Sequence, residues 1–292
     1  MVPRGHVSAL AVLSLGAVVI FPCASAWSNG GYSSDPGNPD FGTHDWIADT
    51  ALTIQTRDVT FLASTYHIEF LLGTEAPDNP DYIGDTFEHH VYYHADGQVQ
   101  DDSCAQRASQ VYQTALVYLN EGDFHSAAYD IGVLAHYVAD VGVFGHTMGA
   151  YTAWGAETHH SDYEDEVNAR VGSLSLPPGT ALGDSSAYMA TMDLAEVITF
   201  GGGPVKSNVW MNASYDWEST EFVSSATASV YASVSAVAAV INHLMIESEQ
   251  PTAPPTHPET PGFSVTLLAI IVASVSATVG IGYAVLRKRP KA

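Results

Sequence analysis

Basic residues are scarce in this 292-residue chain, which has nine Lys and Arg against 32 Asp and Glu and a formal net charge of −23. Every acidic residue lies between positions 27 and 262, where only Arg57, Arg107, Arg170 and Lys206 oppose them, so the formal charge of this stretch is −28. Such a surface attracts cations and repels polyanions at long range. Binding of duplex nucleic acid is not expected, because that binding is driven by a basic face that neutralises phosphates.

Cysteine is nearly absent as well. Cys23 falls in the segment interpreted below as a signal peptide, which leaves Cys104 alone and excludes an intramolecular disulfide framework. A domain outside the cell without disulfides needs a well-packed core, or bound metal, to hold it together.

The alternation of apolar and polar residues that marks β-strands is also scarce, and the sequence shows no internal repeat. Helical periodicity covers most of the remainder. The pattern predicts helices over residues 43–55, 59–73, 104–122, 123–148, 158–172, 188–200 and 217–247. Gly73 is interpreted as a helix stop, and Gly142 and Gly145 weaken the end of the 123–148 helix. The predicted class is all-α, a compact array of antiparallel helices.

The two ends of the chain are expected to be targeting and anchoring segments. Residues 1–26 resemble a signal peptide, with an apolar run and the small residues Ala24 and Ala26 before Trp27; an uncleaved signal anchor is the alternative. We expect a globular domain over 27–248 and a Pro/Thr-rich stalk over 249–262.

An uncharged apolar run over 263–286 is long enough to span a bilayer, and the basic tail 287–292 follows it. The positive-inside rule then places the domain on the extracellular face of the membrane. The Pro-Gly-Phe at 261–263 also resembles an archaeal sorting signal, in which case a lipid would replace the span.

The strongest chemical signal is the segment HYVADVGVFGH at 136–146. His136 and Asp140 are four residues apart, so on a helix both project from one face and can bind one metal ion. His146 lies six residues beyond Asp140 and would face away on an unbroken helix. Either the helix breaks at the glycines or His146 binds a second ion. The alternative for the first pair is a buried histidine hydrogen-bonded to a carboxylate.

Further His and acidic residues form three other candidate clusters. His160 and Glu164 repeat the four-residue spacing, although a solvated acidic helix gives the same pattern. His89, His90 and His94 crowd into a short polar stretch that follows the acidic loop EAPDNPD at 75–81, which is also ordinary turn sequence. The last candidate, His44, is expected in the first turn of a helix. The alternative is a histidine of the capping region that binds no metal.

Taken in order, these motifs resemble the zinc-dependent phospholipase C family of bacteria, which shares its fold with single-strand-specific nucleases. The resemblance runs from Trp27 to about Glu164, and the archaeal-like C-terminus suggests a membrane-tethered member. It implies three zinc ions. The implied ligands are Asp78, His90, His136 and Asp140 for one ion; Trp27 through its free terminus, His44 and the shared Asp140 for another; and His146, His160 and Glu164 for the third.

The resemblance also implies a reaction, the hydrolysis of phosphodiester bonds of phospholipids by metal-activated water. Asp78, preferred over Asp81 and Asp85 as the loop ligand, is the implied general base, and Phe87 matches an aromatic residue of the substrate pocket. Gly30 and Asn79 depart from the family pattern of that pocket, which leaves the lipid headgroup open. A nuclease or nucleotidase on the same scaffold and an inactive surface metal-binding module are the alternatives.

Overall fold

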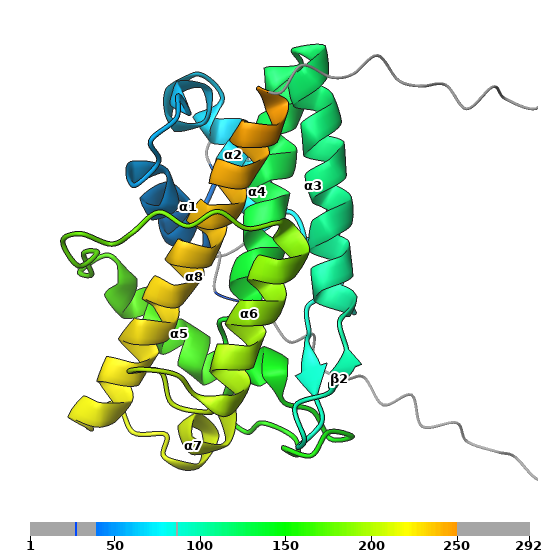
Figure 1. The fold of residues 1–292 in the computed structure, drawn as a ribbon. Helices are drawn as coiled ribbons and strands as arrows, with labels where there is room; N and C mark the ends of the chain where they lie inside the picture. The colour runs from blue at the N-terminus through cyan, green and yellow to red at the C-terminus, as the bar shows by residue number, and fades with distance from the viewer. Residues whose placement is uncertain (1–26, 28–38, 86, 250–292) are drawn as a thin grey trace, which may run out of the picture. The chain divides into compact units, whose positions relative to one another are not determined.

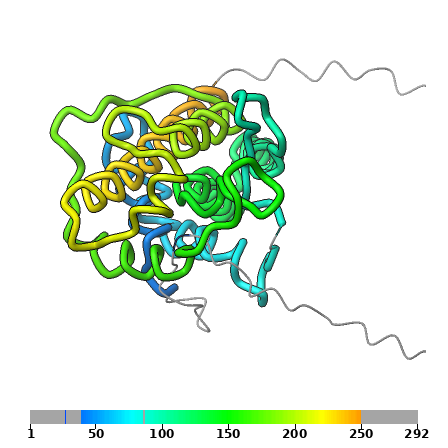
Figure 2. Tube along the Cα trace, turned by 90° about the horizontal axis from the view of Figure 1, so that it is seen from below, coloured from blue at the N-terminus to red at the C-terminus, as the bar shows by residue number. Residues whose placement is uncertain are grey.

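Helix α4 (Phe124–Asp140) is the central helix of this computed structural model, which describes residue 27 and residues 39–85 and 87–249. It packs against α2 (His67–Glu75), α3 (Ser103–Glu121) and α8 (Thr220–Ser248), as Figure 1 shows. Figure 2 shows α3 and α4 nearly end-on and side by side. Every residue of α4 from Ile131 to Asp140 is buried, so this half of the helix lies wholly within the core.

The remaining elements surround this centre, and the prediction of an all-α fold is confirmed. They are α1 (Thr43–Thr53), the π-helical turn η1 (Phe61–Thr65), the 3-10 helix η2 (Phe144–Thr147), α5 (His160–Val171), α6 (Ala187–Phe200) and α7 (Asn208–Ala213). Within the described residues, strand structure is confined to an antiparallel hairpin of β1 (Tyr92–Tyr93) and β2 (Val99–Asp101), apart from isolated bridges. The hairpin and the short α7 were not predicted from the sequence.

The interpretation of Gly73 as a helix stop is wrong, because α2 continues past it to Glu75. A β-carbon at Gly73 would lie 2.1 Å from the Tyr129 carbonyl oxygen, and one at Gly132 would lie 2.0 Å from the Phe70 carbonyl oxygen. Glycine at both positions therefore lets the backbones of α2 and α4 touch. The predicted 59–73 helix is itself divided, because the π-helical turn η1 ends at Thr65 before α2 begins.

The predicted 123–148 helix ends early, at Asp140. The chain then turns and forms η2, which carries His146. Gly142 lies in this turn against α8, where a β-carbon would lie 2.0 Å from Ser233 Oγ. The break turns the chain directly after the second residue of the His136–Asp140 pair, so His146 reaches a different part of the site.

Helix α8 is long and apolar enough to cross a membrane, but 67% of its most apolar window is buried inside the domain. It packs against α1, α4 and α6 and so serves as a core helix. The predicted signal peptide, the apolar run at 263–286 and the basic tail lie outside the described residues, as does the stalk apart from Glu249.

Candidate metal centre

Buried imidazoles and carboxylates meet in three groups near the end of α4. Within each group, one ligand atom from every residue lies within 4.8 Å of the others. The groups are His44, Asp78 and His136; His89, His136 and Asp140; and His146, His160 and Glu164. Because His136 belongs to two of them, the first two groups are continuous with each other.

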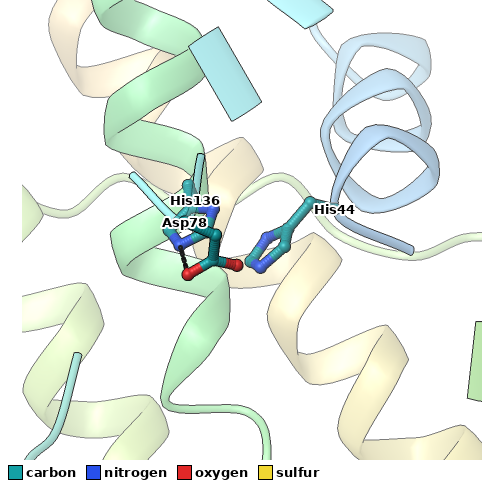
Figure 3. A group of neighbouring side chains, drawn as sticks. All are labelled: His44, Asp78 and His136. Atoms are coloured by element: carbon teal, nitrogen blue, oxygen red, sulfur yellow. Dashed lines mark ion pairs between the residues drawn. The ribbon is translucent and has the colours of Figure 1, made fainter. Parts of the chain in front are cut away.

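The first group brings together three distant segments (Figure 3). His44 lies in the first turn of α1, Asp78 in the loop after α2, and His136 on α4. Asp78 Oδ1 lies 3.7 Å from His136 Nε2, and the rings of His44 and His136 stack with centroids 3.9 Å apart. Figure 3 shows the three side chains pointing toward one another.

Asp140 joins this group to the second through its two carboxylate oxygens. Oδ1 lies 3.2 Å from His44 Nε2, while Oδ2 lies 2.5 Å from His89 Nδ1 and 3.4 Å from His136 Nε2. One carboxylate thus meets three imidazoles that come from different segments. A carboxylate placed in this way can bind two ions at once, one through each oxygen.

The third group is built from η2 and the first turns of α5. His160 Nε2 lies 3.0 Å from Glu164 Oε1 and 3.2 Å from His146 Nε2. The ring of His146 is 6.2 Å from the ring of His89, so this group adjoins the second.

Two histidines are oriented by a second contact on the nitrogen that faces away from the centre. His136 Nδ1 lies 2.7 Å from the Thr74 carbonyl oxygen, to which it can only donate. His160 Nδ1 lies 3.1 Å from Glu157 Oε1. In both rings this directs Nε2 into the group, where it can bind a metal once its proton is displaced, and metal-binding histidines are oriented by such outer contacts.

The electrostatics of the centre favour ligands in their metal-binding forms at two positions. Burial, together with the neighbouring His136, lowers the pKa of His44 to about 3, so this imidazole is neutral near pH 7. Burial alone would raise the pKa of Asp140, but His136, His146 and His89 hold it well below its usual range. Asp140 is therefore ionised.

By contrast, three histidines hold protons when no ion is present, although burial opposes the charge on each ring. Asp140 and Asp78 raise the pKa of His136 above its usual value. Asp140 and Asp85 raise the pKa of His89 to about 11, and Glu157 and Glu164 raise the pKa of His160 to about 10. A bound cation would have to displace these protons.

The described residues fit a metal. Among them, several buried atoms of the groups make no hydrogen bond, namely His44 Nδ1 and Nε2, His146 Nδ1, Asp140 Oδ1 and Glu164 Oε1. Asp140 Oδ1 and Glu164 Oε1 have only the ion-pair contacts to His44 and His160 given above. Unsatisfied buried polar atoms are costly and uncommon, and a cation coordinated by those that face the groups would remove part of that cost. Imidazole and carboxylate are donor types that zinc prefers.

The structure brings together most of the residues that the sequence singled out. His44, Asp78, His136, Asp140, His146, His160 and Glu164 all lie in the groups. Trp27 is completely buried, and its indole Nε1 donates to the carbonyl oxygen of Ala139, next to Asp140.

His90 is the exception. Its half-buried ring packs on His146 with centroids 4.9 Å apart, and it belongs to none of the three groups in the described residues. His89 lies in the position that the resemblance assigned to His90. The sequence offers two adjacent histidines, and the path of the backbone, which no local pattern reveals, decides which of them faces inward.

The structure also places the three Asp residues of the loop in different surroundings. Asp78 faces the groups, Asp81 is exposed, and Asp85 contacts the outer nitrogen of His89. The Phe87 side chain is 85% exposed, and His94 is exposed in the hairpin.

The chain was compared with known protein families, sequences and structures. No family model and no curated protein sequence matches the chain. The solved structure of alpha-toxin from Clostridium absonum aligns with a TM-score of 0.52 and 15% identity over 75% of this chain and 66% of that one, just under two thirds of its length. An alpha-toxin of Clostridium perfringens from an avian strain aligns with a TM-score of 0.49 and 14% identity over 76% of this chain and 67% of that one. The first of these similarities establishes a shared all-α fold.

Proposed function

We propose that this domain hydrolyses phosphodiester bonds of phospholipids, in the manner of a zinc-dependent phospholipase C. The observation that carries the proposal is Asp140, whose two oxygens meet imidazoles from α1, α4 and the loop before β1, beside a third group on η2 and α5. The fold shared with a clostridial alpha-toxin and the resemblance in sequence to the phospholipase C family both support it.

Three zinc ions are the proposed cofactors, and the ligand sets follow the resemblance with one change. His89 replaces His90 beside Asp78, His136 and Asp140, because His89 Nδ1 is the atom that meets Asp140. The free amino terminus and carbonyl of Trp27 would join His44 and Asp140. His146, His160 and Glu164 would bind the third ion.

When bound, zinc supplies a hydroxide from water at neutral pH and polarises the phosphoryl oxygens. Asp78 is the proposed general base, positioned with its Oδ1 3.8 Å from His89 Nδ1 and 3.7 Å from His136 Nε2. It would accept the proton of the attacking water as the new oxygen–phosphorus bond forms. The bond to the diacylglycerol-like alkoxide then breaks, and the alkoxide takes up a proton.

The charge of the chain favours a lipid over a nucleic acid. A chain with 32 acidic residues repels an extended polyanion, whereas a zwitterionic headgroup carries no net charge. One observation supports the nuclease alternative. Single-stranded nucleic acids can bind by stacking on exposed aromatic rings, and the exposed Phe87 provides such a ring.

Localisation on the extracellular face of the membrane, through the apolar run at 263–286, is part of this proposal. A tether of this kind would keep the domain near a lipid substrate. Its test is fractionation of the native protein, followed by mass analysis of the two processed ends.

The activity is tested with the processed full chain, loaded with zinc, on phosphatidylcholine in mixed micelles and on single-stranded DNA. We expect release of phosphocholine that chelation abolishes, and no cleavage of DNA. Cleavage of DNA alone would establish the nuclease alternative. Three bound ions without turnover of either substrate would indicate an inactive metal-binding module.

A further inference from the structure

His89 is turned differently from the other histidines of the centre. His44, His136, His146 and His160 each direct Nε2 toward a carboxylate or imidazole of the groups, whereas His89 directs Nδ1. Its Nε2 therefore faces outward and lies 2.8 Å from Asp85 Oδ1, within ion-pair distance, although the direction of the N–H bond does not make this contact a hydrogen bond.

Asp85 is held in place from the other side. The Tyr137 hydroxyl donates to Asp85 Oδ2, so each carboxylate oxygen has its own partner. Tyr137 is completely buried and follows His136 on α4. Its position is thus fixed by the helix that carries the central ligands.

Arg107 on α3 completes the chain of contacts. Its Nε donates to the Tyr137 hydroxyl oxygen over 3.4 Å, and its guanidinium carbon lies 5.5 Å from the centre of the Tyr137 ring. The same Nε lies 3.4 Å from Glu88, beside His89 in the sequence. The contacts therefore connect α3 and α4 to the loop that bears His89.

From these contacts we infer that Asp85 is a positioning residue for His89 and not a metal ligand. The negative charge of Asp85 beside Nε2 favours a proton on that nitrogen, so that Nδ1 would carry the lone pair directed at an ion shared with Asp140. Tyr137 and Arg107 hold the carboxylate at the required angle. This inference rests on the metal site of the proposed function but not on its substrate.

Direct coordination by Asp85 is the competing role. Against it, Oδ1 lies beside the outward nitrogen of His89, and Oδ2 is bonded to Tyr137. Asp78, by contrast, reaches both His89 Nδ1 and His136 Nε2 from the inner side. Only one of the two loop carboxylates faces the shared centre.

The test measures metal binding by Asp85→Ala, Asp85→Asn and Tyr137→Phe in the full chain, by competition with a chromophoric chelator. Removing a group that orients a metal-bound histidine typically lowers affinity ~10–100-fold. We expect a loss in that range for one ion in Asp85→Ala, and a smaller loss in the same direction for Tyr137→Phe. The affinity of the His146 group is expected to stay unchanged.

Asp49→Ala is the matched control. Asp49 Oδ1 lies 2.8 Å from His67 Nε2, so the same type of pair is removed from the surface at a site away from the groups. No ion should be lost. Cobalt substitution supplies the second readout: the visible spectrum of the affected ion should shift in both Asp85 variants and in Tyr137→Phe, and it should not shift in Asp49→Ala.

Three results would overturn the inference. They are wild-type affinity with an unshifted cobalt spectrum in Asp85→Ala, complete loss of one ion that Asp85→Asn also shows, and absence of zinc binding in the wild type. If Asp85→Ala does not fold in the chelated state, Tyr137→Phe decides, since it removes one oxygen and keeps the buried ring. Failure of phospholipid hydrolysis with the expected metal data would refute the proposed substrate and leave the role of Asp85 intact.

Discussion

The backbone of Gly145 faces the imidazole of His160 so closely that a β-carbon at position 145 would lie 2.9 Å from its Nδ1 and 3.0 Å from its Cγ. The ring cannot yield freely, because Glu157, Glu164 and His146 surround it. Gly145→Ala should therefore displace His160 and weaken the third ion at least ~10-fold, as loss of ligand orientation does. Metal titration of the purified variant measures this.

Gly172 provides the control for that substitution. It follows α5, and nothing lies within 4 Å of a β-carbon built on it. Gly172→Ala should bind all ions as the wild type does. Equal affinities in the two variants would mean that His160 does not depend on the space at Gly145.

Replacement of Asp140 by Asn distinguishes the two ions that would share this residue from the third ion. The side chain keeps its shape, but it loses its charge and one of the two oxygens that reach His44 and His89. We expect loss of the two ions that share Asp140 and of hydrolysis, with retention of the ion held by His146, His160 and Glu164. Metal quantification and activity on one sample check both points.

Asp162→Asn is the corresponding control, since Asp162 is exposed and contacts only the ring of His159 among the described ion pairs. It should alter neither metal content nor turnover. Full turnover by Asp140→Asn would contradict the bridging role of this carboxylate.

An additional residue in front of Trp27 tests the proposed terminal ligand. The indole of Trp27 donates to Ala139, and its ring lies 5.6 Å from that of Tyr163, next to Glu164. A Gly–Trp27 terminus would keep these side-chain contacts but move the amino group. We expect one ion fewer by mass spectrometry under native conditions. An unchanged ion count would show that the amino group of Trp27 is not a ligand.

The contact between α2 and α4 should be sensitive to a single methyl group. Gly132→Ala places a β-carbon 2.0 Å from the Phe70 carbonyl oxygen, and overpacking of this kind costs ~1–3 kcal/mol. Urea unfolding of the chelated protein measures the loss. A free energy of unfolding equal to that of Gly172→Ala would show that the helices separate at no cost.

The pH dependence of the chelated protein follows from the altered pKa values of its histidines. His89 and His160 have pKa values raised to about 11 and about 10, so their stabilising contribution is complete below the unfolded value near pH 6.5 and is lost as the pH rises through 10 to 11. His44 and His90 have pKa values lowered to about 3 and about 4. Their contribution is complete above pH 6.5 and is lost as the pH falls toward those values.

The contribution of these four histidines to the stability of the metal-free protein should thus be greatest near their unfolded pKa of about 6.5 and smaller on both sides. Saturation with zinc should remove the alkaline decline, because the ion replaces the protons of His89 and His160. Urea unfolding at a series of pH values, with and without chelator, measures both curves. Identical curves would show that these histidines bind no metal.

The sequence predicts the helices and the paired candidate ligands because both depend on local spacing. His136 with Asp140 and His160 with Glu164 are one helical turn apart, and each pair lies in one group. The periodicity also yields the long apolar α8. These features require no knowledge of which segments meet in space.

What the sequence leaves undecided depends on long-range packing. The path of the loop before β1 decides whether His89 or His90 faces inward. For Gly73, the sequence alone does not distinguish a glycine that ends a helix from one that allows close contact with a second helix. The role of Asp85 depends on Tyr137 and Arg107, which are distant from it in sequence. No spacing rule connects residues of that kind.

The glycine pair on α2 and α4 has a consequence for anyone who wishes to transfer this centre to another scaffold. The carbonyl of Thr74, which orients His136 over 2.7 Å, belongs to the residue directly after Gly73. Copying the histidines and carboxylates onto two helices at ordinary spacing would leave that carbonyl out of reach. Gly73 and Gly132 are therefore as necessary for the geometry of the centre as the candidate ligands themselves.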